Sequence, residues 1–181
     1  MIKKISEKQI YSDAWLKLFQ DVIVLPNGEK STYAYVQRKN GVAIVVVSVN
    51  NKILLHKEHR YVIQNYSWEI QGGGVDDGES IPDAAIRELK EEAGVIINST
   101  SLISLGSFYP LHSFNTEKVS LFMVITESEI IQKISTEVGE QLTDHRFFNF
   151  DEIYAMIDSG KINDAMTANA VQLAIRKKLN K

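Results

Sequence analysis

Two neighbouring runs decide how this chain folds: Gly73-Gly74-Val75-Asp76-Asp77-Gly78-Glu79 and Arg87-Glu88-Leu89-Lys90-Glu91-Glu92-Ala93-Gly94-Val95. The first run is a glycine-rich turn, and the second is an acidic helix. Ser80 is a good N-cap and Pro82 suits the first helical turn. Gly94 is a typical stop signal, so the sequence predicts a helix that begins after Ser80 and ends before Gly94.

The predicted helix has one acidic face and one apolar face. At about 100° per residue, Glu88, Glu91 and Glu92 fall within an arc of roughly 100°. The residues of the opposite, packing side are Ala85, Ile86, Leu89 and Ala93. Like charges at these spacings cost only about 0.2–0.5 kcal/mol per pair in water, so a solvated acidic face is one reading and a cation site is the other.

The glycines favour the cation site. Gly72, Gly73, Gly74 and Gly78 precede the helix closely, and glycine permits close backbone approach. The turn can therefore bring a main-chain carbonyl beside the helix carboxylates. Hard cations such as Mg²⁺ take oxygen ligands, typically one or two carboxylates together with waters and substrate phosphates. The segment supplies the protein part of such a shell.

The spacing of these residues resembles the complete signature of the Nudix hydrolases. Its defining positions are matched by Gly73, Glu79 and the run Arg87-Glu88-Leu89-x-Glu91-Glu92-x-Gly94-Val95. The resemblance implies an α/β fold, an α/β/α sandwich with a mixed β-sheet. It also implies hydrolysis of a nucleoside diphosphate linked to another group, with Mg²⁺ or Mn²⁺ as the cofactor.

The resemblance assigns the metal ligands by position. Glu88 and Glu92 match the direct ligands, and the carbonyl of Gly72 matches the usual backbone ligand. Glu91 matches a catalytic carboxylate that binds a further metal, directly or through water.

Arg87 and Glu79 match the pair that steadies the helix carboxylates, and both are expected among the catalytic residues. Independently of the resemblance, Arg87 can reach Glu91 one helical turn away and fix its rotamer. The structural role of Arg87 and Glu79, an ion pair between loop and helix, is thus part of their functional role.

Composition and charge fit a small enzyme. The chain has 181 residues, of which 44% are hydrophobic, which suits one domain with a sizeable core. Its net charge of −3 gives no electrostatic footprint for nucleic acid. It has no cysteine, which excludes a disulfide framework and thiolate metal sites. Without a signal pattern or a membrane-spanning apolar run, we expect a cytoplasmic protein with no membrane partner.

Beyond the acidic helix, the order of elements is mixed. Strands are predicted over residues 15–19, 21–25, 31–37, 42–49, 52–56, 120–126 and 146–150, and closing helices over 151–159 and 164–179. The segment 97–105 is ambiguous. We divide the chain into a small N-terminal antiparallel β-sheet over residues 1–40 and a Nudix hydrolase domain over 41–181.

Residues 1–40 indicate which branch of the family the chain resembles. They resemble the N-terminal sheet of ADP-ribose pyrophosphatases and GDP-mannose-type hydrolases, in which this sheet helps to form a homodimer and borders the partner's active site. The resemblance therefore implies a homodimer. The alternative is a monomer in which the sheet only protects an edge.

Three residues are expected to bind substrate. The segment Glu58-His59-Arg60-Tyr61 resembles one whose arginine contacts substrate phosphate, although a surface arginine at a strand end is the alternative. Glu69 lies in Trp68-Glu69-Ile70-Gln71-Gly72, which resembles the family's Trp-Glu-Leu-Pro-Ala-Gly, with Gln71 in place of proline. Glu117 matches an acidic residue that follows the loop after Tyr109-Pro110.

The general base is expected in a late acidic loop, as the resemblance implies. Glu140 is the first candidate and Glu137 the second. The expected products are a nucleoside monophosphate and a sugar phosphate, with ADP-ribose as the first substrate and GDP-mannose types next. Adenine recognition usually needs a stacking aromatic ring, and Trp15, Phe19, Tyr33 and Tyr35 are unranked candidates.

Two alternatives remain open at this stage. The chain is either a Nudix hydrolase of another nucleotide (an oxidised nucleoside triphosphate, a dinucleoside polyphosphate or coenzyme A) or a non-catalytic domain that binds a nucleotide sugar and regulates a partner. Such non-catalytic domains usually lose a signature glutamate, whereas Glu88, Glu91 and Glu92 are all present.

Overall fold

The computed structural model describes residues 1–129 and 142–180. The chain divides into two units, which we describe separately. The smaller unit consists of Met1–Asn40 and Phe108–Val119, and the larger of Gly41–Ser107 and Ser120–Lys181.

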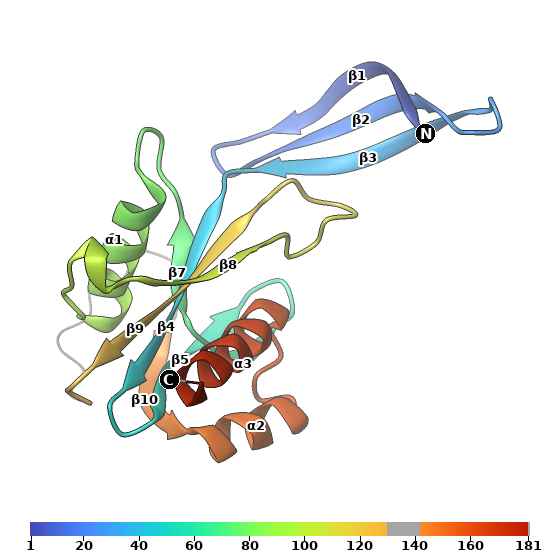
Figure 1. Ribbon diagram of the computed structural model, residues 1–181. Coiled ribbons are helices and arrows are strands. Elements are labelled where there is room, and N and C mark those ends of the chain that lie inside the picture. Colours follow the sequence, from blue (N-terminus) through green and yellow to red (C-terminus); the bar gives the residue numbers. More distant parts are fainter. Residues whose placement is uncertain (130–141, 181) are drawn as a thin grey trace. The chain divides into compact units, whose positions relative to one another are not determined.

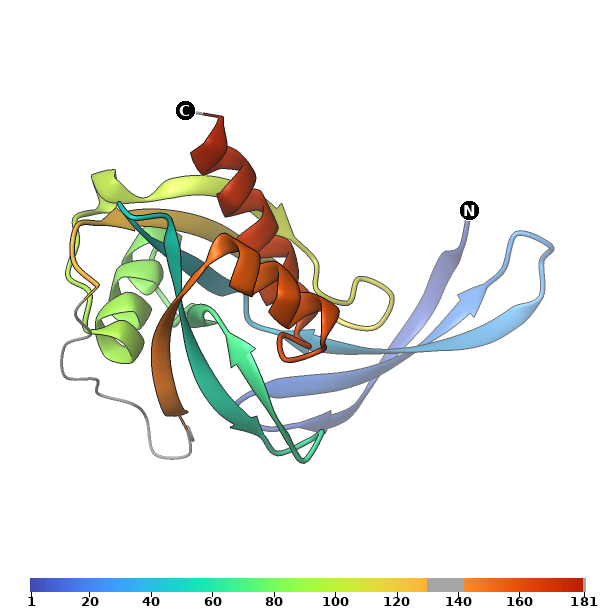
Figure 2. The same ribbon diagram turned by 90° about the horizontal axis from the view of Figure 1, so that it is seen from below.

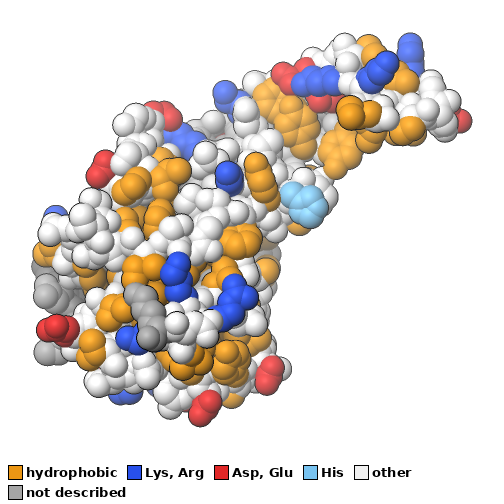
Figure 3. All heavy atoms as spheres, in the orientation of Figure 1, with side chains coloured by type: hydrophobic (Ala, Val, Ile, Leu, Met, Phe, Trp, Pro, Cys, Tyr) orange, Lys and Arg blue, Asp and Glu red, His pale blue; other side chains and the backbone are white. Residues whose placement is uncertain are grey.

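The smaller unit contains a three-stranded antiparallel sheet in the order β1-β2-β3. Its strands are β1 (Lys3–Ser12), β2 (Leu16–Val24) and β3 (Lys30–Arg38). The segment Phe108–Val119 joins this sheet through a bridge between Asn115 and Val36. Figure 3 shows hydrophobic side chains on the surface of the sheet, and Ile5 and Trp15 are among the exposed ones.

The first strand of this sheet has no counterpart in the sequence prediction, and β2 replaces two predicted short strands. The register of β1 against β2 shifts between Lys4 and Ser6 and again between Gln9 and Tyr11. Each shift breaks the alternation of side chains by which a strand is recognised in a sequence. All of β1 is also exposed, so no apolar face marks it.

The larger unit is built on a sheet in the order β10-β5-β4-β9-β8, to which β6 adds by pairing with β5 and β7 by pairing with β4. The strands are β4 (Gly41–Ser48), β5 (Lys52–Arg60), β6 (Asn65–Glu69), β7 (Gln71–Gly74), β8 (Ile103–Phe108), β9 (Val119–Thr126) and β10 (Leu142–Asn149). A short 3-10 helix, η1 (Ser99–Ser101), precedes β8, which resolves the ambiguous segment. The short strands β6 and β7 were not predicted.

Helices cover both faces of this sheet. The helix α1 (Ile81–Ala93) packs on the face that carries Val42, Ile44 and Val46 of β4. The intervening residues of β4 are buried too, and α3 (Ala165–Leu179) contacts this strand. Together with α2 (Phe150–Asp158), α3 lies across the sheet from α1, as Figures 1 and 2 show. The predicted α/β/α arrangement with an additional small antiparallel sheet is therefore confirmed.

The central strands β4 and β5 separate at the candidate site. In the register, β4 and β5 pair only at Val46–Leu54 and Val47–Ile53. Beyond that point β6 pairs with β5 and β7 pairs with β4, and Ile70 connects the two short strands. The backbone of β7 therefore has one edge on β4 and another edge that is free to meet side chains of α1.

Candidate active site

The acidic helix begins and ends where the sequence predicts. The Ser80 side chain accepts a hydrogen bond from the Asp83 N–H at 3.3 Å. Gly94 ends the helix in the left-handed conformation with φ 64°, and its N–H bonds to main-chain carbonyls of the last turn. These caps fix which residues of α1 face the sheet.

Two of the three signature glutamates of α1 are buried. Glu88 is 7% and Glu92 4% exposed, whereas the Glu91 side chain is 37% exposed. Burying a carboxylate is unfavourable unless polar partners compensate for the lost water. A merely solvated acidic face is therefore excluded for Glu88 and Glu92.

Gly72 provides the partner of Glu92. Its N–H donates to Glu92 Oε2 at 2.8 Å, so this edge of β7 faces α1. In an antiparallel strand the N–H and the C=O of one residue point to the same neighbour. The carbonyl oxygen of Gly72 is thus expected on the side of Glu92, as a backbone metal ligand requires.

Gly73 is required for a different reason. A Cβ atom placed on it would lie 2.6 Å from Glu88 Cδ, whereas one on Gly74 would meet nothing within 4 Å. The Glu88 carboxylate therefore lies directly against the backbone of β7, and only glycine leaves room for it.

Arg87 organises the acidic ridge, which is the row of Glu88, Glu91 and Glu92 on α1. Its Nε and Nη2 each donate to a different oxygen of Glu79 at 3.0 Å. Its Nη1 donates to Glu88 Oε1 at 2.8 Å and to Glu91 Oε2 at 3.2 Å, which is the reach that the sequence predicts. The fork is completed by a hydrogen bond to the carbonyl of Gly74.

This network shifts the proton affinity of both main partners. The hydrogen bonds to Glu79, followed by the charge of Glu88, raise the pKa of Arg87 against the opposing effect of burial. In return, the Arg87 guanidinium lowers the pKa of Glu79. Both groups keep their charges throughout the physiological range.

The donor set suits a divalent cation, although the side chains as placed do not converge. Among the described residues, no group of three or more His, Cys, Asp or Glu side chains is arranged to hold a metal ion. The reason is local, because Glu88 and Glu91 both turn to Arg87 and Glu92 turns to Gly72. Carboxylates and a carbonyl are the ligands that Mg²⁺ prefers, so the chemistry of the donor set fits such an ion.

Arg60 and Glu69, both predicted to bind substrate, bind each other. Arg60 Nε donates to Glu69 Oε1 at 3.0 Å and Nη2 to Oε2 at 2.5 Å. Its Nη2 also lies 2.9 Å from Glu58 Oε2. Hydrogen bonding to Glu69 raises the pKa of Arg60 despite burial. Much of the guanidinium fork is thus occupied, and the Arg60 side chain is still 48% exposed on its free side.

The third predicted substrate residue, Glu117, belongs to the smaller unit. Its Oε2 accepts from Arg38 at 3.2 Å and from Asn115 Nδ2 at 3.0 Å. The predicted general bases, Glu140 and Glu137, lie outside the described residues.

The four aromatic candidates for base stacking differ in their surroundings. Phe19 and Tyr35 stack on each other with ring centroids 5.4 Å apart. The Tyr33 hydroxyl donates to the carbonyl of Ser113 at 2.6 Å. Trp15, also in the smaller unit, is 73% exposed.

Sequence reasoning missed a pair of histidines behind the ridge. His56 on β5 lies opposite His145 on β10, and their ring centroids are 5.7 Å apart. Burial, and then the neighbouring His56, lowers the pKa of His145, whose ring is hydrogen-bonded to the backbone of Glu92. The signal available in the sequence was the alternation of residues 52–60, which places His56 on the same face as Leu54.

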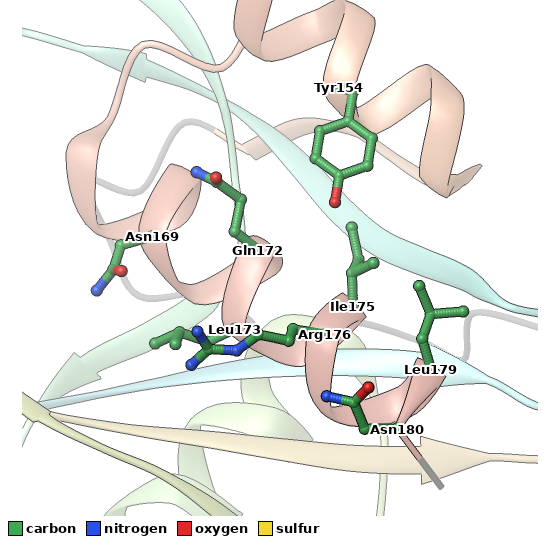
Figure 4. Close-up of a pocket in the computed structure, with 8 residues that line it drawn as sticks. All are labelled: Tyr154, Asn169, Gln172, Leu173, Ile175, Arg176, Leu179 and Asn180. Atoms are coloured by element: carbon green, nitrogen blue, oxygen red, sulfur yellow. The ribbon is translucent and has the colours of Figure 1, made fainter.

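Two surface grooves flank α3, away from the acidic ridge. One has a volume of about 520 Å³ and the other about 430 Å³, and Arg176 lines both. Figure 4 shows the larger groove, with Tyr154 facing α3 across it. Neither groove is lined by a residue of α1 or β7, so we do not assign the active site to them.

The fold and the glutamate ridge together define a nucleotide pyrophosphohydrolase of the Nudix class. The chain belongs to the NUDIX domain family, which matches residues 37–169. Residues 2–36 match the nucleoside diphosphate sugar hydrolase N-terminal domain. Members of the NUDIX family generally use divalent metal ions.

Relatives match nearly the whole chain. An ADP-ribose pyrophosphatase of Bacillus subtilis is 28% identical over 94% of this chain and 90% of its own. A methanol dehydrogenase activator of Bacillus methanolicus is 29% identical over 94% and 90%. The crystal structure of an ADP compounds hydrolase has the same fold, with a TM-score of 0.81, 20% identity and coverage of 99% of this chain and 94% of that chain. No described helix is long and apolar enough to cross a membrane.

Proposed function

We propose that this enzyme hydrolyses the pyrophosphate bond of a nucleoside diphosphate sugar with the help of Mg²⁺ or Mn²⁺. ADP-ribose is the first candidate and GDP-mannose types are the next. The products are a nucleoside monophosphate and a sugar phosphate. The observation that carries the proposal is the buried pair Glu88 and Glu92 held against Gly73 and Gly72.

The proposed substrate class is supported by a match of the N-terminal segment and by a relative that covers nearly the whole chain. The N-terminal segment matches a domain named for nucleoside diphosphate sugar hydrolases. A relative over nearly the full length is named an ADP-ribose pyrophosphatase. Domains that only bind nucleotides usually lack a signature glutamate, and this chain keeps Glu88, Glu91 and Glu92.

Each signature residue has a role in this proposal. Glu88, Glu92, Glu91 and the Gly72 carbonyl hold the cations, which neutralise phosphate charge and lower the pKa of water. Arg87 and Glu79 hold the carboxylates of α1 in place through the hydrogen bonds described above. Arg60, Glu69 and Glu117 orient the substrate, and Glu140 or else Glu137 takes the proton from the attacking water.

We further propose that the enzyme is a cytoplasmic homodimer that associates through the sheet of the smaller unit. All ten residues of β1 are exposed, and β1 is an edge strand. Ile5 is 58% and Trp15 73% exposed. Edge strands with exposed apolar side chains are natural pairing surfaces. Light scattering at several protein concentrations tests the mass, and Ile5→Glu should shift it to that of the monomer.

A second candidate function follows from the other full-length relative. Because that relative is named a methanol dehydrogenase activator, this chain could raise the activity of a dehydrogenase. The two functions are separable. Addition of the protein to such a dehydrogenase, with and without Glu92→Gln, shows whether any activation needs an intact ridge.

The main test is a substrate panel. Purified protein is incubated with ADP-ribose, GDP-mannose, ATP and coenzyme A, with Mg²⁺, with Mn²⁺ and with a chelator, and the products are separated by chromatography. We expect AMP and ribose phosphate from ADP-ribose only when the cation is present. Equal turnover with the chelator, or preference for ATP, would contradict the proposal.

A further inference from the structure

Three buried polar side chains of the larger unit, and one that is partly buried, His145, have buried polar atoms without a hydrogen-bond partner. Within the described part of the chain, both ring nitrogens of His56, the hydroxyl of Ser67, both amide atoms of Gln71 and Nε2 of His145 lack a hydrogen bond. His56 and Ser67 are 1% exposed and Gln71 is 0% exposed. An unpaired buried polar group is destabilising, so native proteins rarely keep several of them together without a partner.

The two histidines lie on the face of the sheet that α1 covers. Leu54 and Phe147 pair with each other and belong to the apolar cluster that includes α1. His56 and His145 pair in the same way, two residues further along β5 and two residues back along β10. Because side chains alternate along a strand, these four residues share one face.

The same argument places the other two side chains. Gln71 lies opposite Ile44, a member of that cluster. Ser67 lies opposite Glu58, which is two residues beyond His56 on β5. All four side chains therefore lie on the same face of the sheet, the face that α1 covers at β4 and β7.

The layer that these four side chains form lies directly behind the end of α1 that we propose to bind metal. The ring of His145 bonds to the backbone of Glu92. The residue after Gln71 is Gly72, whose N–H holds the Glu92 carboxylate. On the other side, His56 Nε2 is 3.8 Å from Glu58 Oε2, the carboxylate that binds Arg60.

The chemistry of the layer favours water over an ion. The unpartnered atoms include the neutral amide of Gln71 and the hydroxyl of Ser67, which both donate and accept. A buried water typically makes about three hydrogen bonds to groups of this kind.

We propose that His56, Ser67, Gln71 and His145 bind ordered water beneath α1, and that this hydrated layer positions Glu92 and Gly72 for the divalent cation. The second half rests on the proposed function, and the first half does not. Gln71 stands where the segment that it resembles has proline, a residue that offers no side-chain hydrogen bond. His56 and His145 act here as positioning residues.

The test joins a crystal structure with measurements of cation binding. We expect electron density for water within hydrogen-bond distance of His56 and Gln71 in the wild-type protein. Mn²⁺ binding is then followed by electron paramagnetic resonance for wild type, Gln71→Leu and His145→Leu. Loss of groups that orient metal ligands typically weakens metal binding about 10–100-fold, and we expect the lower part of that range. His145→Gln, which keeps a donor, should recover part of the affinity.

The matched control is Val46→Ala, in the apolar cluster under the same helix. It should lower Tm and leave Mn²⁺ affinity at the wild-type value. A Val46→Ala protein that loses affinity equally would reduce the effect to general destabilisation and overturn the positioning role.

The remaining outcomes separate the two proposals. If wild-type protein binds no Mn²⁺, the proposed function fails. If it binds Mn²⁺ and both leucine variants bind it equally well, only the positioning role fails. Density that shows Gln71 and His56 bonded directly to protein atoms, with no water between them, overturns the hydrated layer itself.

Discussion

The carboxylate of Glu92 accepts a hydrogen bond from the main-chain N–H of Gly72, with Oε2 and N 2.8 Å apart. This bond joins the last turn of α1 to the free edge of β7. It brings a buried charge and an inward-facing carbonyl together across the point where β4 and β5 part. The end of the helix that we propose to bind metal is thus anchored to backbone, which moves less than a pair of long side chains.

Glu92→Gln should separate catalysis from folding. The amide oxygen can still accept from Gly72, but the negative charge that a cation needs is lost. We expect hydrolysis to fall more than about 100-fold, beyond the loss typical of groups that only orient ligands. Tm should stay unchanged or rise, because a buried charge close to other carboxylates is removed. Calorimetry and a product assay measure the two effects, and Glu127→Gln, at an exposed position of the same unit, is the control.

A variant with full activity would refute Glu92 as a ligand. A variant that fails to fold would show that the charge serves the structure, in contrast to our expectation.

Gly73→Ala and Gly74→Ala form a matched pair. The added methyl group at Gly73 would lie 2.6 Å from Glu88 Cδ, so the carboxylate must move away from β7. At Gly74 the methyl group meets nothing within 4 Å. We expect Gly73→Ala to weaken Mn²⁺ binding at least about tenfold, as displaced ligands do, and Gly74→Ala to bind nearly as wild type. Titration calorimetry with Mn²⁺ decides, and equal affinities in the two variants would argue against Glu88 as a ligand.

The sequence predicted this part of the site well because its determinants are local. The caps of α1 and the contact of Arg87 with Glu91 both follow from spacing along one segment. The burial of Glu88 and Glu92 did not follow, because it depends on the unpredicted strands β6 and β7. These strands are short, and β7 is mostly glycine, so it has no hydrophobic alternation to reveal it.

Contacts between distant segments could not be predicted from the sequence either. The residues opposite His56 come from β6 and β10, and only the register of the sheet brings them to one face. Arg60 illustrates the same limit. Its resemblance to a phosphate-binding arginine is visible in the chain, whereas its bond to Glu69 appears only when β5 pairs with β6.

The bond between Arg60 and Glu69 predicts that Arg60 both stabilises the fold and binds substrate, and mutation can separate these two roles. Arg60→Ala leaves Glu58 and Glu69, which are 8% and 7% exposed, without their cation. Breaking a buried pair costs about 3–5 kcal/mol, and we expect about 1–3 because the Arg60 side chain is 48% exposed. Arg60→Ala combined with Glu69→Gln should recover part of that stability in urea unfolding. If the free face of Arg60 binds phosphate, KM for ADP-ribose stays high in the double variant even though stability returns. Recovery of both would reduce Arg60 to a structural residue.

The stability of the fold at acid pH should depend on the charge of Glu79. Hydrogen bonds from Arg87 lower the pKa of Glu79 below that of an unperturbed glutamate. A carboxyl whose pKa is lower in the folded than in the unfolded state contributes stability above its unfolded pKa. That contribution is lost as the pH falls through the folded value. We therefore expect Glu79→Gln to be less stable than wild type at neutral pH and to approach it as the pH drops below about 4.5, near the unfolded pKa of glutamate.

Unfolding in urea between neutral pH and about pH 3, a range that brackets the unfolded pKa of glutamate, measures this difference for Glu79→Gln and for the control Glu127→Gln. The control should run parallel to wild type, because Glu127 makes no described ion pair. A constant gap between Glu79→Gln and wild type across the range would mean that Glu79 acts through its shape and not through its charge. The ion pair with Arg87 would then contribute little to folding, and its main effect would be to hold the carboxylates of α1 in place.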